Sequence, residues 1–174
     1  NKNLFPVITE IALPPDTAYQ KVILEDISPK PQSVYKDKDG NTLARYSLKP
    51  KTGYKVYANV LVESFLNPSP SELTTSERKS YTSSQKYWET GSSEVRKVAK
   101  DLKSPEDIFN YVVKALSYDT AKKDEKNERL GARKALADPF FAVCLEFTDL
   151  FIALARSKGI PARSVEGYAH TQND

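Results

Sequence analysis

The chain has 174 residues and a mass of 19.5 kDa, enough for one ordinary domain or two small ones. Apolar residues make up 39% and charged residues 28%, so a core can form and the chain is not disordered throughout. The formal charge of +3 is spread along the sequence, which excludes the concentrated basic stripe of a nucleic-acid-binding protein. No segment approaches the roughly 20 apolar residues of a membrane span.

Cysteine and histidine each occur once. A single cysteine excludes an internal disulfide and a thiolate zinc cluster, and a single histidine excludes most His-ligated metal sites. We therefore expect no cofactor and no metal. The sequence also lacks methionine, so we expect Asn1 not to be a native start and the chain to be a piece of a longer protein. An extracytoplasmic or cell-surface protein whose signal or anchor has been removed fits this expectation, and a cytoplasmic origin stays open.

Residues 1–67 have the short apolar and β-branched runs, bounded by turn residues, that are typical of strands. We expect strands over residues 7–13, 19–27, 34–37, 42–48 and 56–65. Asp39-Gly40 lies between the third and fourth of these and predicts a tight hairpin, because glycine adopts the positive φ that such a turn requires. Short antiparallel strands with turn signals predict a small β-sandwich-like domain.

Residues 68–84 are rich in serine, threonine and proline and are interpreted as a linker. From residue 85 the apolar period becomes helical, with a short helix predicted from Ser92 to Leu102. A second helix begins at Ser104-Pro105, an N-cap followed by proline at the first helical position, and ends near Tyr118. We expect a β-domain over 1–67, a linker over 68–84 and a domain over 85–174 that is incomplete at its C-terminus, in an α+β fold.

A further amphipathic helix is predicted to begin at Cys144 and to end at Gly159, with a strand over 162–168 after it. A thiol at the start of a helix meets the positive end of the helix dipole and unpaired backbone N–H groups, which favour the thiolate. The same N–H groups can stabilise an oxyanion on an attacked carbonyl. Cys144 is therefore the candidate nucleophile. The alternative is a buried structural cysteine, since free cysteine behaves as a small apolar residue.

The residues around this helix run from Ala142 to Phe151 and from Ala153 to Tyr168. They contain Cys144, the turn Gly-Ile-Pro-Ala-Arg and a final Gly-Tyr, and they resemble the core of the transglutaminase-like superfamily. The resemblance covers roughly residues 85–170. It implies a nucleophilic cysteine at the start of a helix, within the helical first part of a papain-like core. One departure from the family is Val143, where many members have glycine immediately before the nucleophile.

The family uses Cys, His and Asp, with the His in a His-Ala-Trp-like strand, and this sequence contains no such strand. One interpretation pairs His170 with Cys144 and makes Asp174 the orienting carboxylate. We favour the other, in which His170 is an exposed polar residue and the family's His and Asp lie beyond Asp174. The chain by itself is then expected to be inactive for lack of a base.

Other residues near Cys144 receive structural interpretations. Trp88 is read as a helix-packing aromatic and not as an oxyanion partner, and Arg163 as a structural ion-pair residue. Thr148 and Asp149 are expected to meet solvent or to make local hydrogen bonds. The aromatic residues that are expected to pack the core around the thiol are Phe140, Phe141 and Phe147.

The leading functional hypothesis is a thiol acyl-transfer module that acts on a protein or peptide substrate through a Cys144 thioester. Water would resolve the thioester in a peptidase or amidase, and a lysine amine would resolve it in a cross-linking enzyme. The alternative is a non-catalytic surface interaction or structural module with a degenerate transglutaminase-like fold. The sequence does not indicate the oligomeric state.

Overall fold

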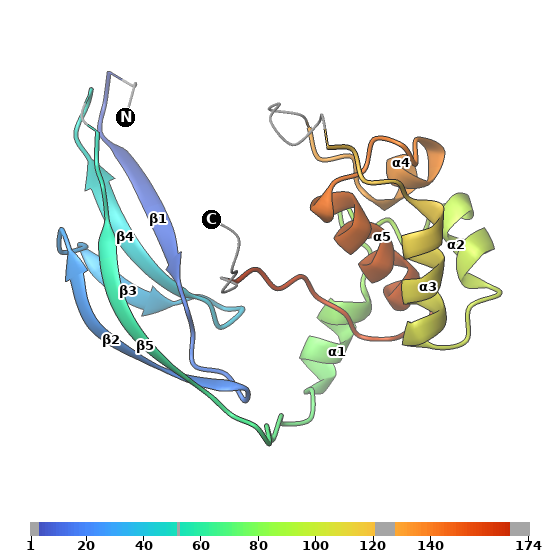
Figure 1. Cartoon of the computed structure of the whole chain (residues 1–174), viewed down its shortest axis with the longest axis horizontal. Coiled ribbons are helices and arrows are strands. Elements are labelled where there is room, and N and C mark those ends of the chain that lie inside the picture. The colour runs from blue at the N-terminus through green and yellow to red at the C-terminus, as the bar shows by residue number, and fades with distance from the viewer. Residues whose placement is uncertain (1–3, 52, 121–127, 168–174) are drawn as a thin grey trace. The chain divides into compact units, whose positions relative to one another are not determined.

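The computed structural model describes residues 4–51, 53–120 and 128–167. The chain divides into two compact units, residues 1–72 and 73–174 (Figure 1). The first unit consists of antiparallel β-sheets and the second of helices, which confirms the predicted α+β class. No helix in the described residues is both long enough and apolar enough to span a bilayer.

In the described residues of the first unit, five strands form two antiparallel sheets. The strands are β1 (Val7–Leu13), β2 (Gln20–Ser28), β3 (Ser33–Lys36), β4 (Thr42–Leu48) and β5 (Tyr57–Ser64). One sheet has the order β1-β4-β3, and the other pairs β2 with β5. All five predicted strands are therefore present, with ends that differ by a residue or two.

The hairpin between β3 and β4 forms at the predicted turn. Gly40 has φ +84°, which an L-residue rarely adopts. The carboxylate of Asp37 accepts the N–H groups of Asp39 and Asn41, each at 2.9 Å. The Asn41 side chain also donates to Asp37, and these hydrogen bonds hold the pKa of this carboxyl below its usual value.

The core of the β-unit is small. Leu13, Ala44 and Tyr46 are its buried members, all from the three-stranded sheet. Ile27 of β2 and Ala58 of β5 pack against them from the other sheet, so the two sheets share one apolar layer. This is the sandwich-like arrangement that the strand pattern predicts.

Five helices lie in the described residues of the second unit. They are α1 (Thr75–Thr82), α2 (Ser93–Ala99), α3 (Pro105–Ala115), α4 (Ala132–Ala137) and α5 (Cys144–Ser157). Ser92 and Ser104 cap α2 and α3 as predicted, each accepting a backbone N–H at 3.1 Å. In α3 the capping box is complete, because the Asp107 carboxylate accepts the Ser104 N–H in return.

Helix α1 lies in the segment that the sequence analysis interprets as linker. Its start is a capping box, in which Thr74 accepts the N–H of Glu77 and Glu77 accepts the N–H of Thr74. The composition of the segment predicted a linker, whereas residues 75–82 form a helix with this reciprocal cap and with contacts to α5. The helix belongs to the second compact unit.

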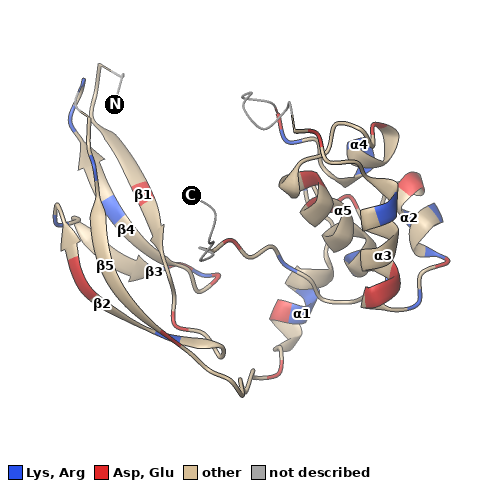
Figure 2. Ribbon diagram, in the orientation of Figure 1, with Lys and Arg blue, Asp and Glu red and all other residues tan. Residues whose placement is uncertain are grey.

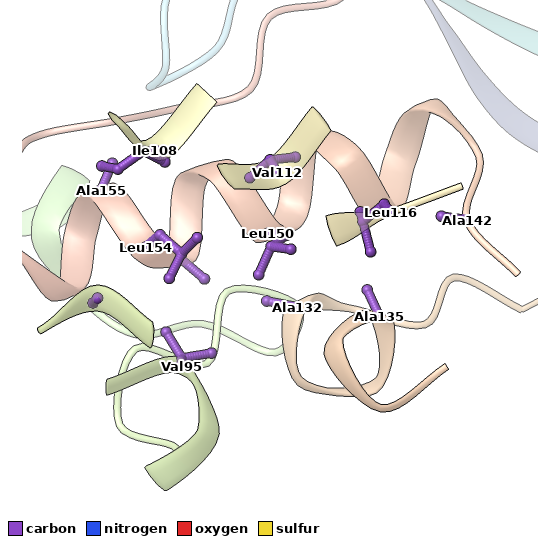
Figure 3. Close-up of a cluster of buried hydrophobic side chains, with 12 residues drawn as sticks. Val95, Ile108, Val112, Leu116, Ala132, Ala135, Ala142, Leu150, Leu154 and Ala155 are labelled. Atoms are coloured by element: carbon purple, nitrogen blue, oxygen red, sulfur yellow. The ribbon is translucent and has the colours of Figure 1, made fainter. Parts of the chain in front are cut away.

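Helix α5 is the centre of the second unit, and each of the other four helices contacts it. Figure 3 shows the side chains that α3 and α5 bury against each other. Ile108 and Val112 of α3, together with Leu116 at its C-cap, meet Leu150 and Leu154 of α5. The apolar stripes predicted from the 3.6-residue period therefore form this core.

The chain leaves α5 as predicted but does not then form the predicted strand. Gly159 has φ +75°, and its N–H and that of Ile160 bond to carbonyls of the last helical turn. Residues 162–167 have no strand partner among the described residues. Instead the N–H of Ala162 donates to the carbonyl of Tyr81 on α1 at 3.0 Å. The prediction of a strand over 162–168 is wrong for 162–167, because backbone pairing and not residue type decides whether an extended segment becomes a strand.

Two adjacent valines on α3 test the core. Val112 is 3% exposed and Val113 is 53% exposed. We expect Val112→Ala to lower the free energy of unfolding by about 2 kcal/mol more than Val113→Ala, because only Val112 loses buried methyl contacts. The gain in helix propensity from valine to alanine is the same for both and cancels. Trp88, the single tryptophan, packs on this core, so its fluorescence in a denaturant titration measures the difference. Equal effects of the two substitutions would contradict the assigned core.

Candidate active site

Cys144 is the first residue of α5, and its side chain is exposed. The backbone N–H groups of Cys144 and Leu145 have no hydrogen-bond acceptor among the described residues. The N–H groups of Glu146 and Phe147, which follow, donate to the Val143 carbonyl. Two unpaired N–H groups therefore lie at the positive end of the helix, next to the thiol. The exposure of Cys144 excludes the interpretation as a buried structural cysteine.

Glu146 joins this helix start to the rest of the unit. Its carboxylate is buried and accepts two backbone N–H groups, that of Val143 at 2.9 Å and that of Leu130 at 3.0 Å. The first bond caps α5 immediately before Cys144. The second ties α5 to the segment that precedes α4, so Glu146 sets the position of the nucleophile relative to a neighbouring element.

The chain before Cys144 is held by the segment that follows α3. The N–H of Ser117 donates to the Pro139 carbonyl and that of Asp119 to the Ala142 carbonyl, both at 2.8 Å. Tyr118 forms a parallel bridge with Ala142 and its ring lies 6.2 Å from that of Phe147. These backbone contacts position the segment that leads into Cys144.

The three phenylalanines near Cys144 do not all pack the core as predicted. Phe147 is partly buried and packs against it. Phe140 and Phe141 are 71% and 57% exposed, so this part of the prediction is wrong. They lie in a turn before the helix, where the helical period that would bury one face does not apply.

Asp149 is fully buried one turn further along α5. Its carboxylate accepts the indole N–H of Trp88 at 2.7 Å and two donors of the Arg129 guanidinium, with Nε at 2.7 Å. These hydrogen bonds raise the pKa of Arg129 above its usual value. The prediction that Asp149 meets solvent or bonds locally is wrong, because its partners lie 61 and 20 residues away.

The Trp88 side chain lies against two cations. The guanidinium of Arg156 lies 4.3 Å from its ring centroid, and that of Arg129 lies 5.9 Å away. Its indole N–H is bonded to Asp149, so Trp88 has the packing role predicted from the sequence and no free donor for an oxyanion.

Arg156 is a buried cation on α5. It donates to three backbone carbonyls, those of Ala162 at 2.8 Å, Ser83 at 2.8 Å and Ser80 at 3.3 Å. Burial lowers the pKa of its guanidinium below the usual value. Through these bonds Arg156 joins the end of α1 to the turn that follows α5. Arg163 of that turn lies over the ring of Tyr81 on α1 at 5.7 Å.

Gly131 allows two segments to come together beside the site. It has φ +79°, and a Cβ there would lie 3.1 Å from the Cα of Tyr87. The next residue, Ala132, donates its N–H to the Tyr87 carbonyl at 2.9 Å. Glycine at 131 therefore lets the strap of residues 129–131, which carries Arg129 and Leu130, lie against the Tyr87–Trp88 segment.

The structure places Cys144, the predicted nucleophile, at an accessible helix start. The other candidates for the triad, His170 and Asp174, lie outside the described residues, so the pairing of His170 with Cys144 stays untested. Sequence reasoning missed the roles of Glu146, Arg129 and Arg156. The signal that could have found Glu146 is its place three residues after Val143, the spacing of a capping box, directly before an apolar run.

The comparisons with known proteins bear on the helical unit. Residues 89–174 match the family described as the Transglutaminase-like superfamily. Neither the curated proteins nor the solved structures contain a match to the chain. The matched region begins one residue after Trp88 and includes Cys144, Glu146 and Asp149.

A double-mutant cycle measures the buried ion pair. We expect Asp149→Asn and Arg129→Gln each to destabilise the helical unit, and the pair to be coupled by about 2 kcal/mol, because each single change leaves a charged partner without its counter-charge. Far-UV circular dichroism in a denaturant titration measures all four proteins. Additive effects would show that the contact contributes nothing to stability.

Alanine substitutions at two glycines with positive φ distinguish the stability cost of the backbone conformation from that of a close contact. We expect Gly159→Ala to cost about 1 kcal/mol from its conformation alone, since nothing lies within 4 Å of the added Cβ. Gly131→Ala has the same conformational cost and also meets the Tyr87 backbone, so it should cost at least about 1 kcal/mol more. The midpoint of Trp88 fluorescence against denaturant gives both values, and equal costs would contradict the close approach.

Proposed function

Residues 89–174 are a transglutaminase-like superfamily domain, and from this premise we propose that Cys144 is the nucleophile of a thiol acyl-transfer module acting on protein or peptide amides. The observation that carries the proposal is the exposed residue Cys144 at the first position of α5, beside two backbone N–H groups that have no acceptor in the described part of the chain. A nucleophile and donors for an oxyanion are the two parts that acyl transfer requires at one carbonyl.

In the proposed reaction the thiolate sulfur attacks the amide carbonyl, and the oxygen gains negative charge. The N–H groups of Cys144 and Leu145 point out of the helix start and would donate to this oxygen. A C–S bond forms, the C–N bond breaks, and the amine leaves with the proton that the thiol gave up to a base. Water then hydrolyses the thioester in a peptidase or amidase, and a lysine amine takes the acyl group in a cross-linking enzyme.

The buried groups around α5 serve this chemistry by holding the nucleophile. Glu146 caps the helix one residue before Cys144, and Asp149 joins the next turn to Arg129 and Trp88. Preorganised donors stabilise a developing charge without having to reorganise. A rigid helix start would therefore lower the barrier of the proposed step.

The thiol reactivity of the folded chain tests the proposal. Since the chain has one cysteine, all alkylation by iodoacetamide reports on Cys144. At pH 6 we expect iodoacetamide to alkylate Cys144 in the folded chain without prior unfolding, because this residue is exposed at the start of α5. We also expect p-nitrophenyl acetate, whose leaving group needs no general acid, to acetylate Cys144 stoichiometrically.

Mass spectrometry of the intact chain measures the mass added by alkylation and by acetylation. Cys144→Ala is the control and should gain no mass. A folded chain whose Cys144 is alkylated only after unfolding in urea, and that is not acetylated, would overturn the proposal. That result would favour the alternative, a non-catalytic module with a transglutaminase-like fold.

A further inference from the structure

The outer face of the two-stranded β-sheet is apolar and exposed. Ile23 of β2 and Leu61 of β5 lie directly opposite each other and are 52% and 54% exposed. Tyr57, on the same strand face as Leu61, is 66% exposed. Among the described residues, each outer edge of this two-stranded sheet has N–H and C=O groups without strand partners, although the Val22 N–H of β2 donates to the Asp16 carboxylate.

Among the strands that the structure describes, β5 is a long edge strand with few of the features that prevent pairing with another strand. Its eight residues contain no proline and one charged side chain, Glu63, and in Figure 2 its ribbon is tan over most of its length. The edge of β2 is interrupted by a register shift between Leu24 and Asp26. Strand β1 carries Glu10 at its centre, and β3 has four residues. Charges, bulges and short strands are the features that prevent edge pairing, and β5 has one charge, Glu63, near its C-terminal end but neither of the other two.

The sequence of β5 is complementary to itself about Leu61. In an antiparallel pair of two copies with Leu61 opposite Leu61, the two-fold axis keeps the outer faces of both sheets on one side. Val60 then lies opposite Val62 of the other copy, Asn59 opposite Glu63, and Tyr57 opposite Phe65, as the spacing of the residues dictates. The pairs are apolar with apolar, an amide donor with a carboxylate, and aromatic with aromatic, and no like charges meet.

From this self-complementarity we propose that β5 is the dimerisation edge of the chain. Two copies pair β5 with β5 in antiparallel orientation to give a four-stranded sheet, β2-β5-β5-β2, in which the occupant of the free edge is a second copy of the same chain. The pairing uses the backbone groups of the edge, and cross-strand contacts around Leu61 set its register. The inference is independent of the chemistry proposed for Cys144.

Sedimentation velocity at increasing concentrations of the full chain tests the pairing. We expect a monomer–dimer equilibrium. Leu61→Lys should weaken the dimer by roughly tenfold or more, because the two-fold axis places two ammonium groups opposite each other. Ile23→Lys is the matched control, equally exposed and directly opposite Leu61 within the sheet but on the strand away from the edge. It should leave the dimer intact.

Cross-linking tests the register. In a Cys144→Ser background, Leu61→Cys should form an intermolecular disulfide under mild oxidation, because residue 61 faces its own copy. Val60→Cys faces position 62 of the other copy and should form little. Circular dichroism confirms that each variant is folded.

Three outcomes would overturn the proposal. One is a chain that stays monomeric at every concentration. Another is a dimer that survives Leu61→Lys or is lost equally with Ile23→Lys, since the contact then lies elsewhere or uses the sheet face. The last is equal cross-linking through positions 60 and 61.

Discussion

The buried carboxylate of Asp149 is the group on which the arrangement around α5 depends. A charge that is removed from water must be paired and hydrogen-bonded, or the fold bears its full desolvation penalty. Asp149 meets this requirement with Arg129 and Trp88, which come from two separate segments before the helix. Because each partner has to reach the same carboxylate, this one group fixes where both segments lie against α5.

The same logic extends to both ends of the helix. At its start, Glu146 satisfies two backbone N–H groups, and at its end Arg156 satisfies three carbonyls. The described residues contain no buried side-chain nitrogen or oxygen without a hydrogen-bond partner. The helical unit therefore buries hydrogen-bonded polar side chains next to its apolar core. Cys144, the first residue of α5, lies on the surface, whereas the helix as a whole contacts α1, α2, α3 and α4.

The two units are built on different principles. The helical unit has a core of twelve buried residues around α5, whereas the β-unit buries Leu13, Ala44 and Tyr46. A small core leaves apolar side chains such as Ile23 and Leu61 exposed and leaves strand edges unpaired. The β-unit thus keeps apolar side chains exposed, whereas the helical unit has buried, hydrogen-bonded polar side chains along the helix that begins at Cys144.

Local sequence pattern sufficed to predict the strands, the helix starts at Ser92, Ser104 and Cys144 and the αL stop at Gly159, and it pointed to Cys144 as a candidate nucleophile. All of these depend on period, capping residues and glycine, which act over a few neighbouring positions. It did not determine that residues 162–167 lack a strand partner or that Asp149 is buried. Those features depend on groups distant in the chain, such as Trp88 and Arg129, which pattern and propensity do not report. Only the tertiary structure decided them, because a carboxylate or an extended segment is defined by what packs against it.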